Sequence, residues 1–422
     1  MTVRAPARTP LTTRGRHVSI ARRRMVMPLE VVVVGGGGHV GLPLALSLAS
    51  AGMHVGIQDV SETTVGQIQA GEAPFIETGL DQLLGQELHA GRLEITTDPA
   101  ILSRTRNVIM VIGTPVDEFL NPVMAVFERA LKDVTPHLAN GSLVILRSTV
   151  FPGTTEYVRK TLAGQGLAAD VAFCPERIAE GHALEELRTL PQIVGADDAT
   201  AGDRAQAFFE RLGVTVVRTG TREAELAKLL TNTWRYMKFA IANQFLVIAE
   251  SAGMDYQTVY DAITTDYPRA ADLPGPGFAA GPCLLKDTMQ LAAFTPDHFP
   301  MGQSAMQINE GLPAFLVDAL KRRHGTLAAK KVGILGMAFK AESDDSRASL
   351  SYKLRKLLAW EGAQVICTDP YVRDPKLVSQ DEVLRDADMF VVGAPHRRYR
   401  GLDVGDRPLV DVWGIVTGRI TL

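Results

Sequence analysis

The sequence is poor in cysteine, with three residues among 422, at positions 174, 283 and 367. Because they are widely spaced and odd in number, they fit neither a disulfide framework nor a zinc site. No apolar run is long enough to span a membrane, and no signal-peptide core follows the basic N-terminus. We therefore expect a cytoplasmic protein with no metal centre and no membrane partner.

Acidic residues are absent from the first 29 positions, which hold seven arginines. A nucleic-acid-binding arm, an organellar transit peptide and an over-extended start before Met25 or Met27 are three possible explanations. The rest of the chain offers no basic stripe that would continue a nucleic-acid groove. We favour a disordered basic leader over residues 1–28 and expect no nucleic-acid partner.

A glycine-rich turn follows the first apolar stretch, residues 29–34. Gly36, Gly38 and Gly41 fit G-x-G-x-x-G between that β-branched strand and an apolar helix. This pattern is typical of a dinucleotide-binding turn, with a pyrophosphate at the helix N-terminus. Asp59 ends the next strand, where a carboxylate binds ribose hydroxyls and repels a 2′-phosphate. The pattern predicts NAD rather than NADP; a Rossmann scaffold that has lost its nucleotide is the alternative.

Strands and helices continue to alternate, which predicts a doubly wound parallel sheet. The expected strands are 93–97, 107–112 and 142–147, with a helix over 123–137. Thr114 and Thr149 follow strand ends, where ligands bind in such sheets; both residue types also cap turns. Glu176 and Glu180 follow a further strand near residue 171. Each is either a buried general base or an ordinary solvated carboxylate.

Residues 221–252 contain neither proline nor glycine, and this absence of helix breakers predicts a helix of about 30 residues. Lys228 and Asn232 are four residues apart and share a face. They indicate a site, unless the lysine extends to solvent. Apolar residues on most sides of this helix predict burial on several faces. These residues are Leu226, Leu229, Leu230, Phe239, Ile241, Phe245 and Ile248.

A second strand–loop–helix pattern starts at residue 330, with strands expected at 363–369, 389–393 and 409–413. Lys340 and Arg347 follow its first strand and can hold a diphosphate. The expected organisation is a basic leader (1–28), a Rossmann-type domain (29–220), a helical region (221–325) and a second α/β domain (326–422). The predicted fold class is α/β, with two Rossmann-like doubly wound parallel-sheet domains joined by a long central helix.

Cys283 lies in a loop of glycine and proline, residues 275–287, that rejects both helix and strand. Asp287 is expected to begin a helix, which places the thiol just ahead of its N-terminus. That position, with Lys286 nearby, favours the thiolate and therefore a nucleophile. A buried, unreactive thiol is the alternative.

Six motifs in order make the chain, from about residue 29 onward, resemble the nucleotide-sugar 6-dehydrogenases, the family of UDP-glucose and UDP-N-acetylmannosamine dehydrogenases. The motifs are Gly-Gly-Gly-His-Val-Gly-Leu-Pro, Arg-Ser-Thr-Val-Phe-Pro-Gly-Thr-Thr-Glu, Cys-Pro-Glu-Arg-Ile-Ala-Glu-Gly, Glu-Leu-Ala-Lys-Leu-Leu-Thr-Asn, Gly-Pro-Cys-Leu-Leu-Lys-Asp and Gly-Met-Ala-Phe-Lys with Asp-Asp-Ser-Arg. The resemblance implies an NAD domain, a central helix used to form a homodimer, and a C-terminal domain for the nucleotide of an NDP-hexose.

The resemblance also implies a four-electron oxidation of the C6 alcohol to the uronic acid, through a Cys283 thiohemiacetal and thioester. Lys228 and Asp287 remove the first proton and order water, Asn232 helps form an oxyanion site, and Glu176 is the base for thioester hydrolysis. The implied catalytic set is Cys283, Lys228, Asp287, Asn232, Glu176 and Thr149. The implied cofactor contacts are Gly36, Gly38, Val40, Gly41, Asp59, Thr114, Thr149, Glu180 and Lys286. The implied substrate contacts are Glu176, Lys228, Asn232, Arg269, Gly281, Lys340 and Arg347, with Arg269 lent across the dimer.

Two segments depart from the family pattern. Many relatives have two glycines and then serine or histidine before the cysteine, where this chain has Ala279-Ala280-Gly281-Pro282, and Ala348 stands where an acidic residue often follows the arginine of the last motif. Because both lie near expected sugar or nucleotide contacts, the hexose and the base stay open. UDP-glucose is the first expectation, and a UDP-N-acetyl-hexosamine or dTDP-glucose is the alternative. A two-electron β-hydroxyacid-type dehydrogenase and a redox-sensing NAD-binding regulator are the rival functions.

Overall fold

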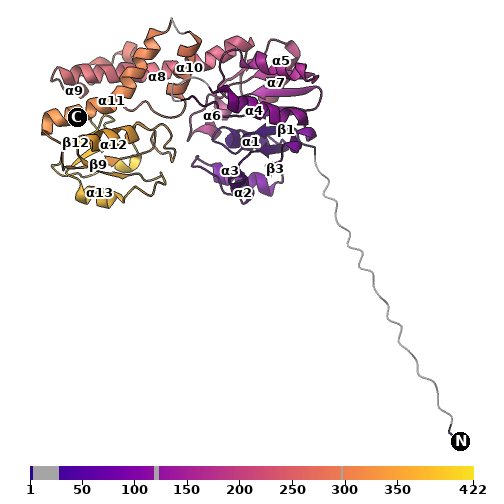
Figure 1. Ribbon diagram of the computed structural model, residues 1–422, viewed down its shortest axis with the longest axis horizontal. Helices are drawn as coiled ribbons and strands as arrows, with labels where there is room; N and C mark the ends of the chain where they lie inside the picture. Colours follow the sequence, from indigo (N-terminus) through magenta and orange to yellow (C-terminus); the bar gives the residue numbers. More distant parts are fainter. Residues whose placement is uncertain (3–27, 118–122, 296–297) are drawn as a thin grey trace.

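The computed structural model describes residues 1–2, 28–117, 123–295 and 298–422. The predicted basic leader, 1–28, therefore lies outside the described residues except at its ends. Figure 1 shows two α/β units side by side, with long helices passing between them and over the C-terminal unit. Among the described residues, no helix is both long and apolar enough to cross a membrane.

The N-terminal unit is built on an eight-stranded sheet in the order β3-β2-β1-β4-β5-β6-β7-β8. All neighbouring strands are parallel except β6 and β7, which are antiparallel. The strands are β1 (Val31–Val34), β2 (Val55–Gln58), β3 (Leu93–Thr96), β4 (Asn107–Met110), β5 (Ser142–Leu146), β6 (Ala169–Phe173), β7 (Gln192–Gly195) and β8 (Val216–Thr219). The chain order reverses between β1 and β4, and ligands of doubly wound sheets bind outside the strand ends at such a point.

Helices cover both faces of this sheet. They are α1 (Gly41–Ser50), α2 (Glu62–Gln69), α3 (Leu80–His89), α4 (Met124–Val134), α5 (Thr154–Gly164), α6 (Ala183–Thr189) and α7 (Ala199–Glu210). Strand β1 shows why both faces need cover, because all four of its valines are buried. Val31 and Val33 pack into one hydrophobic cluster, whereas Val32 and Val34 pack into another on the opposite face.

Two long helices join the units. Helix α8 (Thr221–Ser251) has 31 residues, as predicted, and packs against α11 (Pro300–His324) and α10 (Leu284–Phe294). Helix α9 (Tyr256–Thr264) follows α8. Within a single chain, one side of α8 is left uncovered. Several of its apolar side chains are exposed in this chain: Leu230, Trp234, Ile241, Phe245 and Ile248.

The C-terminal unit has a four-stranded parallel sheet in the order β10-β9-β11-β12. Its elements are β9 (Lys331–Leu335), α12 (Leu350–Trp360), β10 (Gln364–Thr368), α13 (Gln380–Asp386), β11 (Met389–Val392) and β12 (Leu409–Val410). Met389 and Val391 of β11 face one hydrophobic cluster, while Phe390 and Val392 face the other. This sheet is therefore also covered on both faces, and the predicted fold class is confirmed. The predicted domain limits at 220/221 and 325/326 stay predictions.

Candidate active site

The glycine turn between β1 and α1 has the geometry that its sequence predicts. A Cβ on Gly36 would lie 2.8 Å from the Val33 carbonyl oxygen, and one on Gly41 would lie 2.5 Å from the Gly35 carbonyl oxygen. Both positions therefore exclude a side chain, because strand and helix pack closely here. A Cβ on Gly38 would meet nothing within 4 Å. Open space at this glycine leaves room for a pyrophosphate at the N-terminus of α1.

Asp59 closes the same turn from the end of β2. Its carboxylate accepts hydrogen bonds from the Gly37 amide (2.9 Å) and the Ser61 amide (3.1 Å). A cavity of about 770 Å³ opens beside it at the chain reversal, lined by Gly38, Asp59, residues 111–113 after β4, and residues of α4. The turn, the carboxylate and the cavity together fit the pyrophosphate and adenosine ribose of NAD.

Cys283 lies at the N-cap position of α10. The helix begins at Leu284, three residues earlier than predicted, so Asp287 is in its first turn rather than at its start. Cys283 is an exposed residue, whereas Cys174 and Cys367 are buried, and the three cysteines form no disulfide. The sequence prediction of a reactive rather than a packed position is consistent with this exposure.

The prediction that the local field favours the Cys283 thiolate is wrong for this arrangement. Dense packing around the thiol raises its pKa, and the charge of Asp287 raises it further. Lys286 and Lys228 act in the opposite direction but do not outweigh these two effects. The thiol therefore needs a proton acceptor when it attacks.

Two side chains of α8 face the cysteine helix. Asn232 donates a hydrogen bond to Asp287 Oδ2 over 2.5 Å, and both side chains are buried. Lys228, one turn earlier, is 8% exposed, which excludes the alternative of a lysine extending to solvent. Among the described residues, no hydrogen bond or ion pair holds its ammonium group. Burial lowers the pKa of Lys228, although the charges of Asp287 and Cys283 raise it. A lysine of this kind can accept a proton.

The threonines at the ends of β4 and β5 belong to the same constellation. Lys286 Nζ lies 2.6 Å from Asp287 Oδ1 and donates to Thr114 Oγ1 over 3.4 Å. Thr114 in turn donates to the Thr149 carbonyl oxygen, and the Thr149 hydroxyl lies 3.4 Å from Asp287 Oδ2. The structure thus places both predicted threonines beside the buried Asp287.

Glu176 is held by a partner that the sequence reasoning missed. Arg147, 1% exposed at the end of β5, forms an ion pair with Glu176 Oε2. Glu176 Oε1 accepts hydrogen bonds from the amides of Arg177 (2.7 Å) and Ile178 (2.9 Å). Both carboxylate oxygens are therefore engaged. A charged side chain directly after an apolar strand is the signal that could have identified Arg147.

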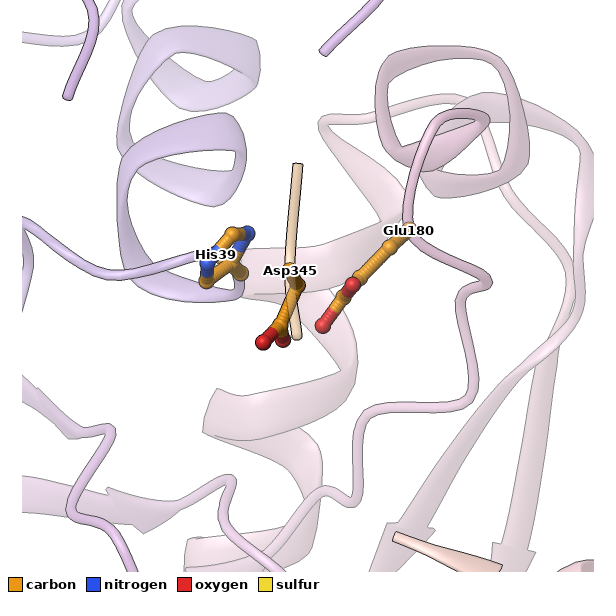
Figure 2. Close-up of side chains that lie close together, drawn as sticks. All are labelled: His39, Glu180 and Asp345. Carbon is orange, nitrogen blue, oxygen red and sulfur yellow. The ribbon is translucent and has the colours of Figure 1, made fainter. Parts of the chain in front are cut away.

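Glu180 lies where the two α/β units meet, and Figure 2 shows its carboxylate beside His39 and Asp345. The candidate ligand atoms of these three side chains lie within 4.8 Å of one another. Burial, and secondly the charge of Asp345, raise the pKa of Glu180 to about 7. Asp345 is already paired with Arg347 at 2.5 Å, so one of the three groups is neutralised. The expected absence of a metal stays a prediction.

Family models for all three parts of this arrangement match the chain. The UDP-glucose/GDP-mannose dehydrogenase family is matched by its NAD-binding domain over residues 29–213, its central domain over 222–311 and its UDP-binding domain over 333–417. The chain belongs to this family. It is therefore an NAD-dependent nucleotide-sugar 6-dehydrogenase, and the predicted family and cofactor are confirmed.

Individual relatives cover almost the whole chain. UDP-N-acetyl-D-mannosamine dehydrogenase of Pyrococcus horikoshii is 31% identical, over 88% of this chain and 91% of the relative. The enzyme of the same name from Methanocaldococcus jannaschii is 32% identical, over 89% of this chain and 88% of the relative. The structure of a UDP-glucose dehydrogenase from Pyrobaculum islandicum superposes with a TM-score of 0.85 at 28% identity, over 92% of this chain and 95% of that one.

The remaining predicted substrate contacts do not all lie in the same part of the molecule. Lys340 reaches the Glu180 carbonyl oxygen, and Arg347 lies 3.7 Å from Glu180 Oε1, so both lie at the junction between the units. Gly281 has φ +99°, and a Cβ there would lie 2.5 Å from the Phe339 ring. Arg269, by contrast, is exposed, and no hydrogen bond or ion pair joins it to a described residue. This single chain does not bring Arg269 to the other site residues, and its role across a dimer stays a prediction. No contact tests Val40, which lies between Gly38 and Gly41 in the turn.

Proposed function

We propose that the protein oxidises the C6 alcohol of a UDP-hexose to the uronic acid in two steps, with Cys283 carrying the intermediate. The observation that carries this proposal is the meeting of an accessible cysteine with a buried lysine and a buried aspartate at the start of α10. A two-electron dehydrogenase needs no nucleophile at this position. NAD, when bound, supplies the hydride acceptor for C6 in both oxidations.

Lys228 is the group best placed to take protons in the first half of the reaction. Because burial lowers its pKa, its neutral amine is more available than that of an exposed lysine. It receives the C6 hydroxyl proton as the alcohol becomes an aldehyde. The ammonium passes this proton to solvent, and the neutral amine then accepts the Cys283 thiol proton as sulfur bonds to the aldehyde carbon. The positive charge of the Lys228 ammonium and the Asn232 amide next stabilise the oxyanion of the thiohemiacetal.

Hydrolysis of the thioester needs a water molecule and a group that accepts its proton. Asp287 and Thr149, 3.4 Å apart, are the pair that orders this water. Glu176 is the proposed base. To act, it would have to give up its contact with Arg147 or with a backbone amide and bind the water instead. Attack by water breaks the carbon–sulfur bond, releases the carboxylate and returns the proton to the Cys283 sulfur.

The names of the relatives bear on the sugar. Relatives that match about 90% of the chain are named UDP-N-acetyl-D-mannosamine dehydrogenases, and a further one of Ralstonia solanacearum is named for NDP-N-acetyl-D-galactosaminuronic acid. We therefore place a UDP-N-acetyl-hexosamine ahead of UDP-glucose, which was the first expectation from sequence. UDP-glucose stays the second candidate, because the Pyrobaculum islandicum enzyme with that substrate in its name has a closely similar fold.

A substrate panel decides between these sugars. NADH release is measured with UDP-N-acetylmannosamine, UDP-glucose and dTDP-glucose at equal concentrations. The proposal predicts the highest kcat/KM with the N-acetylated sugar. Faster turnover of UDP-glucose would reverse the order, and turnover of none of them would contradict the nucleotide-sugar assignment.

We also propose that the protein forms a homodimer through α8. Its exposed apolar residues recur at intervals of three, four and seven along the helix and so form one stripe. They are Leu230 (48% exposed), Trp234 (53%), Ile241 (41%), Phe245 (39%) and Ile248 (57%). A contiguous apolar stripe on a surface helix is typical of an interface between proteins. The dimer would also bring a second chain close enough to lend Arg269.

A further inference from the structure

A buried histidine in the C-terminal unit contacts the loop that carries the two proposed phosphate-binding cations. His396 is fully buried and follows β11. The loop comprises residues 336–349, follows the neighbouring strand β9, and includes Lys340 and Arg347. Asp369 follows β10, the strand on the other side of β9. Three adjacent strand ends therefore meet at one point, and none of the roles assigned above uses His396 or Asp369.

The hydrogen bonds at this point fix the protonation of the ring. The Glu342 amide donates to His396 Nδ1 over 3.0 Å. Because a backbone N–H can only donate, Nδ1 must be unprotonated, and the proton of the neutral ring is on Nε2. Nε2 lies 3.1 Å from Asp369 Oδ2, which accepts it. Asp369 Oδ2 also accepts from the amides of Met337 (2.6 Å) and Ala338 (2.9 Å).

These contacts hold the loop at its start and at its middle. Glu342 has φ +54°, an uncommon conformation for a residue with a side chain, so surrounding contacts must maintain it. Its carboxylate is also fixed, because it accepts from the Arg397 amide (2.7 Å) and the Tyr371 hydroxyl (3.0 Å). The loop then reaches the cysteine segment: its Phe339 ring packs on Gly281, and the Gly281 amide donates to the Ala348 carbonyl oxygen over 3.4 Å.

We propose that His396 is a positioning residue for substrate binding: by accepting the Glu342 amide proton, it holds loop 336–349 so that Lys340 and Arg347 meet the diphosphate of the sugar nucleotide. The inference rests on the proposed role of this loop in binding the nucleotide. It requires the tautomer that is protonated on Nε2, with Nδ1 as the atom that holds the loop. A histidine that merely filled space would have no such preference.

Two substitutions separate the ring nitrogens. In His396→Asn, the amide oxygen occupies the place of Nδ1 and can still accept from Glu342. In His396→Gln, the longer side chain reaches Asp369 but leaves the Glu342 amide without an acceptor. We expect His396→Gln to weaken UDP binding about tenfold, the effect of losing one buried hydrogen bond. His396→Asn should bind UDP much more nearly like the parent, and both should bind NAD unchanged.

The experiment measures UDP and NAD binding by calorimetry on the full chain, with KM and kcat for the sugar nucleotide alongside. Tyr399→Phe is the control, because it removes a buried hydroxyl beside the His396 ring without touching the loop. Equal losses of UDP affinity in both His396 variants, or none in His396→Gln, would overturn the inference. Failure of the unsubstituted protein to bind UDP at all would instead contradict the proposed function.

A second measurement needs no variant to fold. The ring-nitrogen chemical shifts of isotope-labelled histidine in the unsubstituted protein report which nitrogen carries the proton. We expect His396 to be protonated on Nε2 alone. Protonation on Nδ1 would show that the ring does not accept from Glu342, and the inference would fail.

Discussion

Cys283 differs from the other two cysteines in being accessible and in lying within reach of a lysine and an aspartate. The sequence could indicate its loop and its nearness to a helix, because glycine, proline and the helix pattern are local signals. Its pKa could not be predicted in the same way. The direction of the shift depends on how densely distant segments pack around the sulfur and on the buried charge of Asp287.

Replacing Cys283 by serine tests the nucleophile. A serine hydroxyl is less acidic and a much weaker nucleophile than a cysteine thiol, so we expect uronic acid formation to fall by at least about 10³-fold. The assay is product analysis after reaction with NAD and the sugar nucleotide. Cys367→Ala is the control, because Cys367 is buried in the C-terminal unit and should leave the rate nearly unchanged. A Cys283→Ser variant with the parental rate would eliminate the thioester route.

Glu180 should make the stability of the protein depend on pH. Burial and Asp345 raise its pKa from 4.5 to about 7. The folded state therefore binds this proton more tightly than the unfolded state does. As a result, the free energy of unfolding falls as the pH rises from 4.5 to about 7. Glu180→Gln removes the titration, so the variant should match the parent near pH 4.5 and exceed its stability above about pH 7, by on the order of 1–3 kcal/mol. Urea unfolding at several pH values measures this.

Glu156 offers a control of opposite sign. Arg159 and Lys160 lower its pKa to about 2. Its ionised form therefore favours the folded state, and that contribution is lost as the pH falls from 4.5 towards 2. Glu156→Gln should show no gain in stability at high pH. If the two glutamine variants responded to pH in the same direction, the electrostatic environment assigned to Glu180 would be wrong.

At the scale of elements, strong local patterns were predictable and weak ones were not. The valine strand β1 and the 31-residue helix α8 follow from periodicity and from the absence of helix breakers. Strands β7 and β8 were missed; β8 is partly exposed and shows no apolar alternation. The 25-residue helix α11 contains Pro313, which hides its length from a pattern that treats proline as a stop.

The cysteine loop gives a prediction about backbone shape. Gly281 has φ +99° and faces the Phe339 ring, so an added methyl group is disfavoured by conformation and by contact. We expect Gly281→Ala to lower kcat/KM by on the order of 10–100-fold, because a shift of about 1 Å at this loop misplaces the sulfur. Steady-state kinetics measure it. Gly275→Ala, with nothing within 4 Å of its added Cβ, should be tolerated; equal effects at both glycines would refute the argument.

At the scale of the whole molecule, the sequence indicated which residues form the site but not how the two units meet. Lys228 and Asn232 share a helix face by spacing alone. The approach of His39 and Glu180 to Asp345 and Arg347, by contrast, depends on how segments more than a hundred residues apart are placed. The exposed stripe of α8 was equally hidden, because periodicity does not show whether an apolar face is covered by the same chain or left for another.

The stripe predicts the effect of charge on assembly. Trp234→Glu combined with Ile241→Glu places two carboxylates in the proposed interface, and we expect a dimer to become a monomer. Analytical ultracentrifugation measures the mass. Trp360→Glu is the control, because Trp360 is 87% exposed on α12, away from α8, and should leave the mass unchanged. A parent protein that sediments as a monomer would exclude the dimer.

The central claim is that one site oxidises one carbon twice, with the intermediate held on Cys283. Its most direct test is the stoichiometry of NADH to sugar with a limiting amount of the UDP-hexose that the protein turns over. The account predicts two NADH and one uronic acid per sugar nucleotide, with no free aldehyde. One NADH per sugar, with an aldehyde or ketone released, would contradict it.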